Sequence, residues 1–132
     1  MNERIICSKN LKNGLKVDFC EHGNRYFGDY HQVKVTVRCR IDLTTELVSP
    51  RVSVDDLEKA RKFFGASIEY RKLLRQMGVA GADVEKVQSE LIENFAKNAL
   101  QYMESNDFAA RFVARQLANR KERSRVLVNL HD

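Results

Sequence analysis

The sequence contains no tryptophan, one proline and six glycines in 132 residues. So little proline and glycine excludes a collagen-like chain and a low-complexity disordered chain. No stretch approaches the roughly 20 apolar residues of a membrane-spanning helix. The opening residues "MNERIICSKN" lack the apolar run of a secretory signal. We therefore expect a cytoplasmic protein that has no membrane partner.

Cysteine is scarce and is not arranged as a known framework. The three residues are Cys7, Cys20 and Cys39, and no Cys-x-x-Cys pair occurs. An odd number argues against a closed set of disulfides, which is consistent with reduced thiols in the cytoplasm. Buried cysteine usually packs as a small apolar side chain, which is the ordinary explanation for all three.

The common catalytic and nucleotide-binding motifs are also absent. The chain has no Walker loop, dinucleotide fingerprint, Gly-x-Ser-x-Gly or His-Glu-x-x-His. Nothing therefore nominates an enzyme or a cofactor, and we expect no cofactor. A catalytic site built from residues remote in sequence stays open as an alternative.

What the chain does contain is ordinary globular chemistry, with 43% hydrophobic and 31% charged residues. Its length fits one domain with a core of its own. We predict a single domain over residues 1–132. Its parts are strands in 1–45, a linker in 46–53, helices in 54–125 and a tail or final strand in 126–132.

The first half alternates between apolar and polar residues, which predicts strands. "HQVKVTVRCRIDL" places its apolar residues at odd numbers from Val33 to Leu43, and "GLKVDFCE" does the same from Leu15 to Phe19. "RIICS" is a third candidate strand, and Asn13-Gly14 is a hairpin-turn signal. If the strands around Leu15–Phe19 and Val33–Leu43 pair antiparallel, residues directly opposite each other lie on the same face of the sheet. Odd-numbered residues should therefore face odd-numbered residues, and the two numbers of each facing pair should add up to an even value near 52 or 54.

The second half has helical spacing. Ser53 and Asp56 form a capping box before an apolar stripe that continues to Met77. A second helix is expected over 84–103, capped by Asp83, and a third after Asp107. "RVLVNL" fits a final strand or a last helical turn, and we favour the strand. The predicted fold is α+β: a three-stranded antiparallel meander, with this C-terminal segment as a fourth strand, packed on one face by three helices.

The stretch "CEHGNRYFGDYHQ" looks most like a site. Strand parity sends His22 and His31 to opposite faces, so we expect no metal site. Asp18, Cys20 and His22 share a face, and cysteine beside histidine is the minimum for a thiolate nucleophile. These three are the catalytic candidates, although residues two apart on a strand are separated by roughly 6.5–7 Å. The ordinary explanation is a surface strand with an incidental thiol.

The aromatic residues of this stretch suggest a partner surface. Arg25, Tyr26, Phe27 and Tyr30 fall in a long loop predicted between the strands, from about residue 22 to residue 31. Aromatic residues and arginine are typical of interface centres, whereas packing onto the protein's own core is the commoner outcome. The strand over 31–43 is also expected to leave one edge unpaired, which invites association. The leading hypothesis is a non-enzymatic protein-interaction module that binds a protein partner or itself as a homodimer.

The net charge of +5 suggests the alternative, a nucleic-acid-associated protein. Residues 111–125 contain six basic residues and one acid, so this segment accounts for the whole excess. Phosphate contacts would come from Arg111, Arg115, Arg120, Lys121, Arg123 and Arg125. These residues scatter around a helical wheel, and a solvated helix end is the ordinary explanation.

Overall fold

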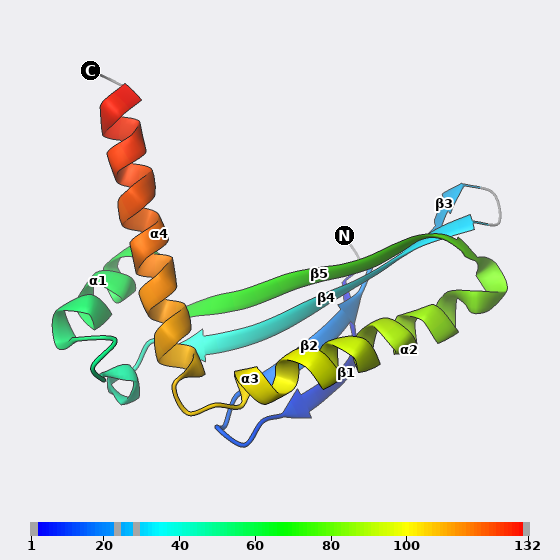
Figure 1. The fold of residues 1–132 in the computed structure, drawn as a ribbon, viewed down its shortest axis with the longest axis horizontal. Coiled ribbons are helices and arrows are strands. Elements are labelled where there is room, and N and C mark those ends of the chain that lie inside the picture. The colour runs from blue at the N-terminus through cyan, green and yellow to red at the C-terminus, as the bar shows by residue number, and fades with distance from the viewer. Residues whose placement is uncertain (1–2, 23–24, 28–29, 131–132) are drawn as a thin grey trace. The chain divides into compact units, whose positions relative to one another are not determined.

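The computed structural model describes residues 3–22, 25–27 and 30–130, with side chains for residues 3–22 and 30–120. It has an α+β fold with an antiparallel sheet and helices, as the sequence predicts (Figure 1). Two compact units are present, residues 1–40 with 69–105 and residues 41–68 with 106–132. The single domain that the sequence suggests stays a prediction.

The sheet of the first unit has five strands among the described residues. Their bounds are β1 Arg4–Asn10, β2 Lys16–Glu21, β3 Arg25–Phe27, β4 Tyr30–Asp42 and β5 Ser67–Ala80. The strand order is β1-β2-β4-β3, and β5 also pairs with β4. In Figure 1, β5 runs back alongside β4 in the opposite direction. The long strand β4 is therefore the centre of the sheet.

The hairpins follow the predicted parity but not the predicted register. The β1–β2 turn has Gly14 at φ 88°, which confirms the turn signal. Between β2 and β4, Val17 faces Cys39 and Phe19 faces Val37. The residue numbers of each facing pair therefore add up to 56 rather than to 52 or 54. Shifting one strand by two residues leaves every side chain on the same face of the sheet. The alternation of apolar and polar residues therefore does not determine the register by itself.

The loop predicted between these strands, from about residue 22 to residue 31, is longer than the loop in the structure. Residues 25–27 form β3, in which Arg25 pairs with His31 and Phe27 with Tyr30. Residues 23–24 and 28–29 lie outside the described part of the chain. The hairpin therefore remains paired well beyond the end of β2.

The first predicted helix is also too long. Helix α1, Val54–Phe64, ends at Gly65, whose φ of 92° does not continue a right-handed helix. Residues 67–77, expected as helix, form most of β5 instead, and β5 ends at Ala80. The additional strand therefore comes from the middle of the chain and not from the C-terminus. Residues 126–130, which we assigned to a strand, belong to helix α4, Phe108–Leu130.

The core of the first unit lies between the odd-numbered face of the sheet and one long helical segment. This segment comprises α2 (Val84–Phe95), a π-helical turn (Ala96–Leu100) and α3 (Gln101–Met103). The rings of Phe19 and Phe95 meet edge to face with centroids 6.0 Å apart. The odd-numbered side chains of β4 from Val33 to Cys39 are fully buried, as predicted.

Two details of this helical segment differ from expectation. The side chain of Asp83 makes no capping hydrogen bond, because it belongs to a 3₁₀ turn that precedes α2. Tyr102, expected on the buried face, is half exposed, whereas Leu100 and Met103 are buried. A π turn inserts one extra residue, so the positions that face the sheet move along the sequence.

The second unit contains α1 and α4, which pack against each other. The predicted capping box of α1 is present, with reciprocal bonds of 3.1 Å between Ser53 and Asp56. The guanidinium of Arg120 lies 4.2 Å from the centroid of the Phe63 ring. Phe108, Val113 and Leu117 are the large buried apolar residues of α4.

Candidate functional site

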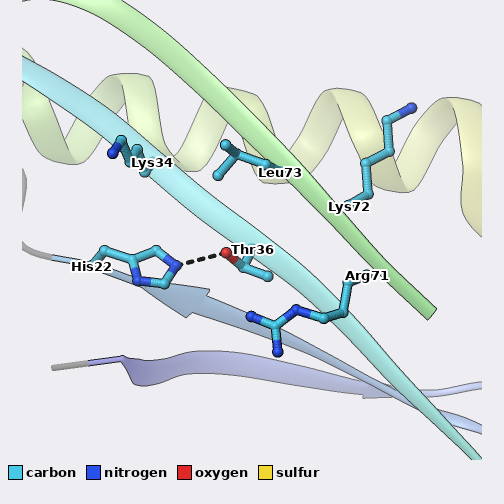
Figure 2. A pocket seen from close by; sticks show the side chains of 6 residues that line it. All are labelled: His22, Lys34, Thr36, Arg71, Lys72 and Leu73. Atoms are coloured by element: carbon cyan, nitrogen blue, oxygen red, sulfur yellow. Dashed lines mark hydrogen bonds between the residues drawn. The ribbon is translucent and has the colours of Figure 1, made fainter. Parts of the chain in front are cut away.

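The even-numbered face of β2 and β4 lies opposite the face that packs on α2. The sequence predicts it to be a polar surface, yet Thr36 is only 5% exposed and Cys20 is fully buried. Arg71 of β5 extends over this part of the face (Figure 2), and Glu3, the residue before β1, contacts Arg38 there. The face is therefore more enclosed than strand alternation indicates.

A cluster of four charges joins three segments on this face. The Arg38 Nη2 atom lies 2.9 Å from Glu69 Oε2, and its Nη1 lies 3.4 Å from Glu3 Oε1. The Arg71 Nη1 atom lies 2.9 Å from Glu69 Oε1. The hydrogen bond from Arg38, together with that from Arg71, lowers the pKa of Glu69, and the Glu69 carboxylate raises the pKa of Arg38. The cluster is balanced in charge and aligns β5 with β4.

Beside this cluster lies a solvent-open hollow of about 410 Å³. Its lining residues are His22, Lys34, Thr36, Arg71, Lys72 and Leu73. The His22 Nε2 atom and the Thr36 hydroxyl oxygen are 2.6 Å apart. Figure 2 shows His22, Thr36 and Arg71 facing one another, while Lys72 extends away from them. None of the described lining residues is acidic.

The predicted catalytic candidates do not assemble into a nucleophile. Asp18 accepts a hydrogen bond from the Ser8 hydroxyl, and His22 is bonded to Thr36 rather than to Cys20. Burial raises the pKa of the Cys20 thiol, and the nearby Glu3 carboxylate raises it further. A raised pKa disfavours the thiolate, which is the reactive form. The geometry therefore gives no support to thiol catalysis at Cys20.

Thiol reactivity should follow burial. Cys7 is partly exposed, whereas Cys20 and Cys39 are buried, and burial raises the pKa of Cys39 to about 11. In the native protein at neutral pH we expect an aromatic disulfide reagent to label Cys7 first. Cys20 and Cys39 should react only at the rate of unfolding. A Cys7→Ser variant should lose the fast phase, and a fast phase that remains would restore Cys20 as a candidate.

The predicted partner-binding residues are only partly described. Tyr30, at the start of β4, is 60% exposed. Arg25, Tyr26 and Phe27 lie in β3 rather than in a loop, and their side chains fall outside the described part of the chain. Of these four residues only Tyr30 has a described side chain, so the aromatic interface stays a prediction.

The basic segment 111–125 lies within α4. Arg111 forms an ion pair with Asp107 at 2.8 Å, and Arg120 stacks on Phe63, so both interact within their own unit. Arg115 is exposed. The side chains of Lys121, Arg123 and Arg125 are outside the description. The segment is thus a helical surface, and its predicted nucleic-acid contacts are untested.

Strand β5 supplies a feature that the sequence reasoning missed. It pairs with β4 along one side, and no described strand pairs with its other side. Leu73 and Met77 are 49% and 54% exposed, and Lys72 and Arg75 also face solvent. The available signals were Gly65, which ends α1, and the alternation of Ile68, Glu69, Tyr70 and Arg71. The unpaired edge expected on β4 is therefore found on β5.

Neither a metal-binding cluster nor a membrane-spanning helix is found among the described residues. No three histidine, cysteine, aspartate or glutamate side chains gather there in a way that would hold a metal ion. Their helices include none with the length and apolar character required to cross a membrane. No protein-family model, curated protein or solved structure matches the chain. Function must therefore be argued from the geometry of β5 and of the face beside it.

Proposed function

We propose that this chain is a non-enzymatic, cytoplasmic protein-interaction module that self-associates through the outer side of β5. The observation that carries the proposal is the 14-residue edge strand with two half-exposed apolar side chains. An unpaired edge presents a row of backbone N–H and C=O groups that another strand can complete. Most edge strands are shorter or are blocked by a bulge, a proline or a covering segment.

A second copy of the chain is the simplest occupant of this edge. Two β5 strands related by a two-fold axis would pair antiparallel and would continue the sheet from one copy into the other. Pairing would cover Leu73 and Met77, which are the exposed apolar residues of β5. Lys72 and Arg75 make no ion pair with any described residue, so they would repel their counterparts. Added salt screens this repulsion, and association should therefore strengthen with ionic strength.

Light scattering of the purified chain tests the proposal. We expect a mass of twice 15.3 kDa whose population increases as salt is raised from about 0.05 to 0.5 M. Leu73→Lys and Met77→Lys should each weaken the dimer by about tenfold or more, because each adds charge and removes apolar contact. Ile5→Lys, a similar change at an exposed position of β1, which pairs with β2 and not with β5, is the matched control.

Other outcomes separate the alternatives. A monomer at every salt concentration would reject self-association. If the dimer were lost in Tyr30→Ser but not in Leu73→Lys, the interface would lie at the β3–β4 end of the sheet rather than along β5. Retention of DNA or RNA that falls with salt, and that disappears when Arg120, Lys121 and Arg123 are neutralised, would support the nucleic-acid alternative instead.

A further inference from the structure

We infer that the hollow between His22, Thr36 and Arg71 binds the phosphate group of a small phosphate ester. This inference does not rest on the proposed self-association, although Leu73 belongs to both surfaces. The hollow is built from three strands: His22 directly follows β2, Thr36 lies on β4 and Arg71 on β5. Figure 2 shows their polar groups turned toward one another. Polar groups thus converge on one volume from three strands, and one hydrogen is shared in the bond between His22 and Thr36.

The donor set fits phosphate better than a carboxylate. A carboxylate is planar, and one arginine fork satisfies it. A phosphate monoester carries up to two negative charges and three acceptor oxygens in different directions. Arg71 and Lys34 supply the cations of the hollow, and His22 and Thr36 supply the shorter polar groups. No acid is among the described residues that line the hollow, and the nearest carboxylates, Glu69 and Glu3, contact Arg71 from behind the wall.

Arg71 is also held in place before any ligand arrives. Its Nη1 atom bonds Glu69 at 2.9 Å, and Glu69 is itself held by Arg38. A guanidinium has five N–H donors, so these contacts leave donors for a ligand. A binding side chain fixed by such a second layer of bonds loses little conformational entropy when the ligand binds.

The size of the hollow indicates an ester rather than the bare ion. Its volume of about 410 Å³ lies within the usual range for small-molecule sites. Leu73 provides an apolar part of the wall beside the polar groups. The organic part of the ester is therefore expected to lie against Leu73, while its phosphate faces Arg71.

Adenosine monophosphate, inorganic phosphate and adenosine are the probes, titrated into ¹⁵N-labelled full-length protein and followed by NMR. We expect the monophosphate to shift the amide signals of residues 34–36 and 71–73 and to bind more tightly than inorganic phosphate. Adenosine should not bind. Arg71→Gln and Lys34→Gln should each weaken binding by about tenfold. Arg75→Gln removes the same charge from the same strand outside the hollow, so it should change the affinity less than twofold.

Several results would overturn the inference. Equal losses in Arg71→Gln and Arg75→Gln would show attraction to a general basic surface, as would signal shifts spread over the chain. If adenosine bound as tightly as its monophosphate, the phosphate group would not be recognised by the hollow. If inorganic phosphate bound as tightly as the ester, the organic group would make no contribution to the affinity. If Arg71→Gln does not fold, Lys34→Gln decides, because Lys34 is outside the Glu3–Arg38–Glu69–Arg71 cluster.

Discussion

Replacement of Phe19 by alanine is expected to lower the free energy of unfolding by about 3–5 kcal/mol. The side chain is fully buried at the middle of β2 and meets Phe95 of α2 edge to face. It also lies opposite Val37 in the register of β2 and β4. Truncation removes apolar burial and the ring contact, and it leaves a cavity between the sheet and the helix.

Urea denaturation followed by circular dichroism measures this loss. Phe19→Leu keeps most of the volume and should cost clearly less, at about 1.5 kcal/mol or below. Phe63→Ala is a second control, because Phe63 is partly exposed on α1. A loss at Phe19 no greater than the loss at Phe63 would show that the sheet and α2 are not packed as described.

Replacement of Asn13 by alanine is expected to cost about 2 kcal/mol, which is a large effect for a turn residue. The Asn13 amide donates to the backbone oxygens of Met103 at 2.7 Å and Ser105 at 3.0 Å. Its carbonyl oxygen accepts from the N–H of Leu15 at 3.1 Å. One side chain thus shapes the β1–β2 turn and ties it to the end of α3.

Variants at neighbouring positions separate these two roles in the same denaturation experiment. Asn13→Asp keeps an acceptor for Leu15 but places a carboxylate against two carbonyl oxygens, so it should cost at least as much as alanine. Asn10→Ala, at an exposed position of β1, should change the free energy of unfolding by less than about 0.5 kcal/mol. A loss below 0.5 kcal/mol for both Asn13 variants would contradict the described contacts.

Local signals in the sequence predicted the local features well. Alternation in residues 33–43 identified the buried face of β4, and the spacing of residues 84–95 identified α2. The Ser53–Asp56 capping box and the Asn13-Gly14 turn occur as predicted. Each of these depends on backbone geometry within a few residues, which side-chain type controls directly.

The wrong predictions concern residues whose apolar spacing fits both a helix and a strand. They also concern strands whose pairing partner is distant in the sequence. Residues 67–77 carry an apolar stripe that suits a helix, but Gly65 ends α1 and the following segment finds an open edge on β4. The final apolar residues were expected to form a strand and instead extend α4. Short apolar runs are ambiguous between helix and strand, and available partners decide between them.

The candidate site depends on that remote pairing. The sequence by itself determined the α+β class and the even-odd division of β2 and β4. Only the tertiary structure moved the free edge to β5 and brought Arg71 beside His22 and Thr36. The physical reason is that a residue's side of a strand is a local property, whereas the strand that pairs with it depends on the whole sheet.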